Sequence, residues 1–95
     1  MNIDIKEFLK LDFDNINIID IRNTFDYRRG HISGSINIPS NYLIYNFSKY
    51  LDKNRTYYIY CNSGISSLNL VNKLNSFGYN TITIDGGYNK YLLEK

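Results

Sequence analysis

The fold of this chain is decided by one stretch, Tyr57-Tyr58-Ile59-Tyr60-Cys61-Asn62-Ser63-Gly64-Ile65-Ser66-Ser67. Its first four residues are strong β-formers and predict a buried strand. A short loop containing Gly64 follows, and apolar residues then recur at helical spacing over residues 66–77 until Gly78 closes the helix. A strand that passes directly into a helix is the building unit of α/β proteins.

Strands and helices also alternate on both sides of this stretch. We expect strands over residues 16–21, 36–38 and 81–84, and helices over residues 5–11, 24–29 and 88–93, with a further helix over about residues 40–51. Asp4 with Glu7 forms a capping-box pattern, Asn23 or Thr24 and then Ser40 are expected helix caps, and Gly30 is an expected helix end. The alternation predicts an α/β fold with a central parallel sheet of about five strands and helices on both faces.

Composition limits the classes of protein to which the chain can belong. It has 95 residues, 43% of them hydrophobic and 21% charged, which predicts one globular domain over residues 1–95. The net charge of +2 gives no reason to expect a nucleic acid or an anionic membrane as a partner. No apolar run approaches a membrane span, and residues 1–10 lack a signal-peptide core. With a single cysteine and so no internal disulfide, we expect a cytoplasmic location.

Cys61 is the candidate reactive residue. It follows a buried strand, and ligand sites in open α/β sheets form beyond the carboxyl ends of strands. Unpaired amides of the loop and the helix N-terminus favour a thiolate there, and the thiolate is the nucleophile. Gly64 allows the loop to curl, and the small side chains of Ser63, Ser66 and Ser67 leave a shallow pocket open.

From these residues alone, two interpretations of Cys61 stay open, a nucleophile and a buried small hydrophobic residue. A zinc site is excluded, because Cys61 and His31 are the only cysteine and histidine.

Four segments of the chain resemble the rhodanese (thiosulfate sulfurtransferase) family, in the order that family has them. They are Ile18-Ile19-Asp20-Ile21-Arg22, Gly30-His31-Ile32-Ser33-Gly34-Ser35-Ile36-Asn37-Ile38-Pro39, the loop Cys61–Ser67, and Phe77-Gly78-Tyr79 with Asp85-Gly86-Gly87-Tyr88. The resemblance implies the three-layer rhodanese-like fold.

The resemblance also implies a sulfurtransferase. Thiosulfate or another persulfide donor would give sulfur to Cys61, which would pass it as a persulfide to cyanide, a thiol or a protein. The persulfide-binding loop would be formed by Asn62, Ser63, Gly64, Ile65, Ser66 and Ser67. Neither a metal nor a cofactor is expected, and we expect a monomer or a weak dimer.

Residues outside the loop are given structural roles. Asp20 and Arg22 are expected to pair and hold the strand end near the site. The resemblance places His31 in a turn, where its ring would tie down the backbone. Ser66 stands where the family usually has Arg, which weakens the case for an anionic donor such as thiosulfate.

Two alternative functions follow from Ser66, which replaces the usual Arg, and from the fold. One is a non-catalytic module that binds a partner or senses oxidants through Cys61. The other is a phosphatase, which ranks last because phosphate binding needs a longer loop and an Arg.

Overall fold

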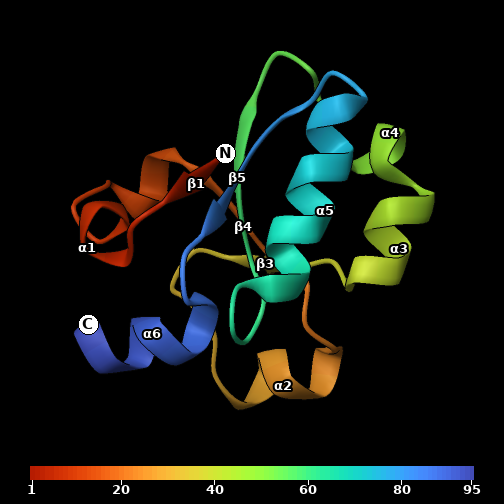
Figure 1. The fold of residues 1–95 in the computed structure, drawn as a ribbon. Helices are drawn as coiled ribbons and strands as arrows, with labels where there is room; N and C mark the ends of the chain where they lie inside the picture. Colours follow the sequence, from red (N-terminus) through yellow and green to blue (C-terminus); the bar gives the residue numbers. More distant parts are fainter.

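Five parallel strands form the central sheet, in the spatial order β1-β5-β4-β2-β3 (Figure 1). The computed structural model describes residues 1–95. The strands are β1 (Asn2–Ile3), β2 (Asn17–Asp20), β3 (Ile36–Asn37), β4 (Thr56–Tyr60) and β5 (Asn80–Ile84). The predicted α/β architecture is confirmed, with β5, β4 and β2 between the edge strands β1 and β3.

Helices cover both faces of this sheet. They are α1 (Ile5–Phe8), α2 (Thr24–Arg29), α3 (Ser40–Tyr45), α4 (Phe47–Tyr50), α5 (Ile65–Ser76) and α6 (Gly87–Glu94), with a 3-10 helix at Phe13–Asn15. Figure 1 shows α3, α4 and α5 on one face, α1 and α6 on the other, and α2 beyond the carboxyl end of the sheet. None of these helices is both long and apolar enough to cross a bilayer.

The alternation of side chains along β4 separates two hydrophobic cores. Tyr57, Ile59 and, just after the strand, Cys61 belong to the core under α3, α4 and α5. Tyr60 belongs to the core under α1 and α6, and Tyr58 packs against it. The period of two along a strand therefore places the Cys61 side chain on the α5 side of the sheet.

Several local expectations need correction. The helix expected over residues 40–51 is broken at Asn46, whose φ of −136° is not helical, and Ser40 is its first residue, not its cap. Asp4 does cap α1, but Glu7 pairs with Lys10 and does not complete a capping box. Strand β1 and the 3-10 helix were not located by the sequence patterns, since each is only two or three residues long.

Candidate active site

Cys61 lies at the carboxyl end of β4, directly before the loop that leads into α5. Its side chain is buried, with only 7% of the residue exposed. The backbone amides of Gly64 and Ser67 donate hydrogen bonds to Cys61 Sγ at 3.1 and 3.4 Å. Gly64 has a φ of +95°, a left-handed conformation that side chains disfavour, and this turn brings the amides back toward the sulfur.

The sulfur takes the place of a helix-capping side chain. Gly64 is the N-cap residue of α5 and makes no side-chain cap hydrogen bond. A capping side chain normally accepts from the amide three residues into the helix, which here is the amide of Ser67. Because Cys61 Sγ accepts that bond, a negative charge on sulfur also lies at the positive end of the α5 dipole.

Ser67 approaches the sulfur with its hydroxyl as well as its amide. The Cys61 thiol and Ser67 Oγ lie 3.4 Å apart, and Ser67 Oγ also lies 3.3 Å from the Gly64 carbonyl oxygen. Thr83 Oγ1, from β5, is 2.6 Å from Ser67 Oγ. Ser67 and Thr83 are both buried, so their hydroxyls have no access to bulk water.

These contacts favour the thiolate. Burial raises the pKa of the Cys61 thiol, but the Ser67 hydroxyl and the amides of Ser67, Gly64 and Ser63 lower it by more, so the pKa lies below its ordinary value. A lowered pKa increases the fraction of reactive thiolate near neutral pH.

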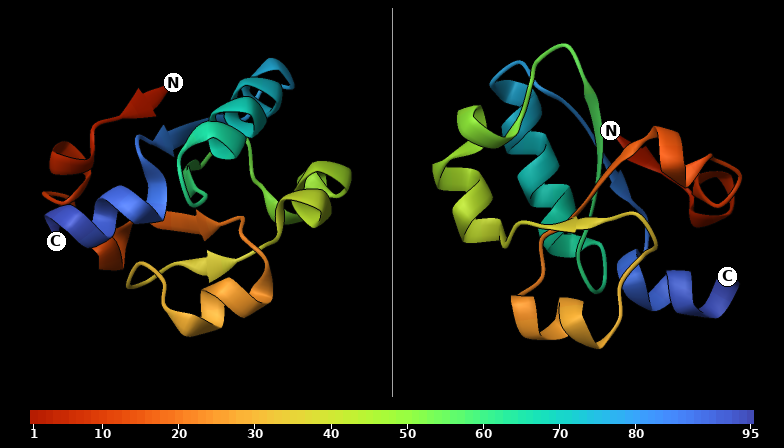
Figure 2. Two further views of the ribbon diagram at one scale, coloured as in Figure 1. Left: turned by 60° about the horizontal axis from the view of Figure 1, so that its bottom comes forward. Right: turned by 180° about the vertical axis from the view of Figure 1, so that it is seen from behind.

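The first turn of α6 lies beside the reactive loop (Figure 2) and is hydrogen-bonded to its backbone. The amides of Tyr88 and Asn89 donate to the carbonyl oxygens of Cys61 and Asn62 at 2.9 and 3.0 Å. Gly87 has a φ of +58°, and a Cβ atom at this position would collide with the Cys61 carbonyl oxygen. Glycine is therefore required where the turn meets the reactive loop.

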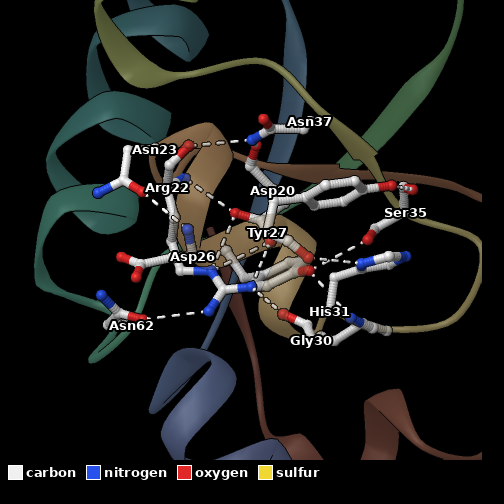
Figure 3. Close-up of polar contacts among 12 residues, drawn as sticks. Asp20, Arg22, Asn23, Asp26, Tyr27, Gly30, His31, Ser35, Asn37 and Asn62 are labelled. Carbon is white, nitrogen blue, oxygen red and sulfur yellow. Dashed lines mark hydrogen bonds and ion pairs between the residues drawn. The ribbon is translucent and has the colours of Figure 1, made fainter.

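Asp20 and Arg22 form a buried ion pair beside the loop (Figure 3). Arg22 donates from Nε and a terminal nitrogen to the Asp20 carboxylate, at 3.1 and 2.8 Å. The guanidinium also donates to the Gly30 carbonyl oxygen and to Asn62 Oδ1, and it stacks over the Tyr88 ring at 4.2 Å. The pair thus connects the end of β2 to the reactive loop and to α6.

A cavity of about 300 Å³ opens in front of Cys61. Its lining consists of Ile21, Arg22, Asn23, Asp26, Ser40, Cys61, Asn62, Ser63 and Ser66. Arg22 is the one cation there, and its charge is offset by Asp20. Asp26, near the start of α2, adds a carboxylate for which no hydrogen bond or ion pair to a protein group is found.

The structure brings most, but not all, of the expected loop side chains to the sulfur. Asn62, Ser63 and Ser66 line the cavity, and Gly64 and Ser67 contact Sγ. The side chain of Ile65 does not line the cavity and is 69% exposed, so only its backbone can serve the site.

His31 is absent from the cavity. Its Nδ1 bonds the Tyr27 carbonyl oxygen at 2.8 Å, and its ring stacks on Tyr27 at the end of α2. No three His, Cys, Asp or Glu side chains gather where they could bind a metal ion.

The site residues that the sequence reasoning missed include Asp26, Thr83 and Gly87. The signal for Thr83 is a polar residue that alternates with Ile82 and Ile84 along a strand, a signal that Thr81 shares, and Gly87 was placed only in a turn. Asp26 has no signal in the chain pattern, because its position at the cavity depends on how α2 folds back.

Comparisons with known proteins identify the family of this chain. The family model described as "Rhodanese-like domain" matches residues 5–94. A thiosulfate sulfurtransferase of Shewanella oneidensis is 31% identical over 80% of this chain and 75% of its own length. A tRNA uridine(34) hydroxylase of Buchnera aphidicola is 33% identical over 86% of this chain. The chain spans only 28% of that hydroxylase, and 12% of a tRNA sulfurtransferase of Thermoplasma acidophilum.

Solved structures show the same fold. A rhodanese-related protein from Thermoplasma volcanium superposes with a TM-score of 0.88 at 27% identity, over 98% of this chain and 91% of the other. A protein from Staphylococcus saprophyticus superposes with a TM-score of 0.83 at 31% identity, over 95% of this chain and 91% of the other. Together with the family match over almost the whole sequence, these similarities show that the chain belongs to the rhodanese-like domain family.

Proposed function

We propose that this protein is a sulfurtransferase that carries sulfur as a persulfide on Cys61. The observation that carries the proposal is the environment of Cys61 Sγ, which accepts two backbone amide hydrogen bonds at the N-terminus of a helix. Relatives named as thiosulfate sulfurtransferases and as a tRNA sulfurtransferase support sulfur transfer as the general activity. We also propose that it works in a reducing compartment such as the cytoplasm, where its single cysteine stays a thiol.

The transfer takes two displacement steps. The Cys61 thiolate attacks the outer sulfur of a donor, the new S–S bond forms, and the donor's own bond breaks with the electron pair on the leaving group. With thiosulfate the leaving group is sulfite. An acceptor thiolate or cyanide then attacks the terminal sulfur, and Cys61 leaves as the thiolate with which the cycle began.

The persulfide anion would lie among the amides at the start of α5. Its terminal sulfur lies about 2 Å beyond Sγ, toward the cavity. The amides of Ile65 and Ser66 belong to the first helical turn and have no acceptor within the helix. They are available to the persulfide, and the hydroxyls of Ser63 and Ser66 line the same cavity.

The charges around the cavity bear on which donor is used. Ser66 supplies no cation, Arg22 is paired with Asp20, and Asp26 adds a negative charge. A thiosulfate dianion is repelled by Asp26 and gains little from Arg22. The lining therefore favours a donor with less charge than the thiosulfate dianion, such as a persulfide on a thiol or a protein cysteine.

Intact mass spectrometry tests the proposal. The reduced protein is incubated with thiosulfate, and separately with a low-molecular-weight thiol persulfide, and then with cyanide. We expect one added sulfur atom with at least one donor, its discharge by cyanide as thiocyanate, and no adduct in Cys61→Ser.

Two outcomes would contradict sulfur transfer by Cys61. If no donor loads a folded protein, sulfur carriage by Cys61 is wrong, and the binding or oxidant-sensing module becomes the better description. Cys61-dependent hydrolysis of an aryl phosphate would instead support the phosphatase alternative.

A further inference from the structure

Two buried threonines, Thr81 and Thr83, lie at alternate positions of β5 and face α5. Thr81 Oγ1 donates to Asn75 Oδ1 at 2.7 Å, and Thr83 Oγ1 lies 2.6 Å from Ser67 Oγ. Ser67 and Asn75 are separated by two helical turns on the same side of α5. The two threonines therefore have similar environments, but only Thr83 reaches a residue that contacts Cys61.

The hydrogens carried by the Cys61 thiol and by the Ser67 and Thr83 hydroxyls determine which group donates in each of these hydrogen bonds. Ser67 has one hydroxyl hydrogen and three oxygen or sulfur neighbours, which are Cys61 Sγ, the Gly64 carbonyl oxygen and Thr83 Oγ1. While Cys61 is a thiol, its S–H donates to Ser67 Oγ, and Ser67 donates to Gly64 or Thr83.

Loss of the thiol proton reverses the direction of these bonds. A thiolate only accepts, so the Ser67 hydroxyl turns to donate to Sγ. The contact of 2.6 Å between Ser67 and Thr83 then persists only if Thr83 donates to Ser67 Oγ. A donated bond polarises the Ser67 hydroxyl and strengthens the bond that it makes in turn to sulfur.

We propose that Thr83 is a positioning residue for sulfur chemistry at Cys61, and that it holds the Ser67 hydroxyl in the orientation that donates to the sulfur anion. This role deepens the proposed function and rests on Cys61 being the reacting sulfur. Thr83 touches neither sulfur nor substrate directly, so it acts only through Ser67.

Few charged groups lie near Cys61, so a change in its titration caused by a substitution at Thr83 can be measured. Arg22 at the end of β2 and Asp26 on α2 are the ionisable side chains that line the cavity with Cys61. Neither the loop residues 62–67 nor the hydroxyl pair Ser67–Thr83 carries a charge at neutral pH. A substitution at Thr83 therefore changes the Cys61 titration without changing a neighbouring charge.

The test is the pH profile of Cys61 alkylation by iodoacetamide in the reduced protein. Thr83→Val keeps the shape and the strand preference but removes the hydroxyl. We expect it to raise the apparent pKa of Cys61 by about half a unit to one unit, which is about three- to tenfold less thiolate below that pKa. Thr83→Ser restores the hydroxyl and should return the profile toward the wild type.

Thr81→Val is the matched control, because it removes a buried hydroxyl from the same strand and the same side of the sheet. It should lower stability without moving the alkylation profile. In a Ser67→Ala background, Thr83→Val should have no further effect, since its route to the sulfur is gone. If Thr83→Val does not fold, Thr83→Ala takes its place in the same cycle.

Two results would overturn the role of Thr83. One is an unchanged Cys61 profile in folded Thr83→Val, and the other is an equal shift in Thr81→Val. Alkylation needs no sulfur donor, so the result is independent of persulfide loading. A shifted profile in a protein that loads no sulfur would refute the proposed function and leave the Thr83–Ser67–Cys61 coupling standing.

Discussion

The amide of Tyr88 donates a hydrogen bond to the carbonyl oxygen of Cys61 over 2.9 Å, although the two residues are 27 positions apart in the sequence. This bond fixes the residue that carries the reactive sulfur to the first turn of α6. It also explains the glycine directly before Tyr88, because a Cβ atom on Gly87 would collide with the backbone of Cys61 and Asn62. The reactive loop is thus held from two sides, by its own helix and by the next β–α turn.

Gly87→Ala is expected to damage both stability and reactivity. The new Cβ would meet the Cys61 carbonyl oxygen in a left-handed backbone conformation, and the turn would have to move away. We expect a loss of about 2–4 kcal/mol in the free energy of unfolding, measured with urea, and slower alkylation of Cys61.

Gly78→Ala provides the comparison for this change. Gly78 also has a positive φ, but its nearest neighbour would be the flexible end of Lys53. Gly78→Ala should lower the free energy of unfolding by about 1–2 kcal/mol and leave alkylation of Cys61 unchanged. Equal effects of the two substitutions on alkylation would contradict a special role for the contact between Gly87 and Cys61.

Asp20→Asn should destabilise the fold strongly. It would leave the buried Arg22 guanidinium without its countercharge, and breaking a buried ion pair in this way costs about 3–5 kcal/mol. Urea unfolding measures the loss, with Asp52→Asn as the control, because the exposed pair of Asp52 with Arg55 is worth about 0–1 kcal/mol. Similar losses in the two variants would show that Asp20 does not hold the strand end as described.

The sequence predicts the parts of this molecule whose determinants are local. The amides that contact Cys61 belong to residues three and six positions later, so a strand, a glycine and a helix start suffice to predict them. Thr83 could not be predicted in the same way. It reaches Ser67 because β5 pairs with β4 in a register that sets Thr83 beside Ile59, and no local pattern states that register.

The same distinction holds for the secondary structure. The long apolar periodicities of α5 and β4 are strong local signals, and both elements were predicted to within about two residues. Strand β1 exists because Asn2 and Ile3 pair with the edge of β5, and the break at Asn46 depends on how α3 and α4 pack. Tertiary packing decides such short features, and it leaves little trace in the order of residues.

The lowered pKa of Cys61 predicts a pH-dependent contribution to stability. The thiolate is favoured in the folded state, so this contribution is fully present above the ordinary pKa of a cysteine and is lost as the pH falls through the folded-state value. Between these two pKa values, the free energy of unfolding of the wild type should rise with pH relative to Cys61→Ser.

Urea unfolding of both proteins under reducing conditions, at about pH 6 and about pH 9, measures this difference. Comparing the two proteins cancels the titration of all other groups. A stability difference that stays constant, or that shrinks as the pH rises, would contradict a lowered pKa.

Ser66→Arg should increase the use of thiosulfate. Ser66 lines the cavity in front of Cys61, and a guanidinium there adds a cation that is free to meet an anionic donor. We expect kcat/KM for thiosulfate, followed as thiocyanate formation, to rise about tenfold and to fall again with added salt. Asp26→Asn removes the carboxylate from the same lining and should raise it about threefold by relieving repulsion.

Asn72→Arg is the matched control for charge, because it adds the same cation to an exposed position of α5 outside the cavity. It should leave thiosulfate use within twofold of the wild type. A thiol persulfide, whose reacting group carries less charge than the thiosulfate dianion, should respond less than thiosulfate to the two cavity substitutions. If Ser66→Arg and Asp26→Asn leave thiosulfate use unchanged while loading from the thiol persulfide is intact, the charge of the cavity does not select the donor. Shape or access at the buried Cys61 would then have to account for the choice of donor.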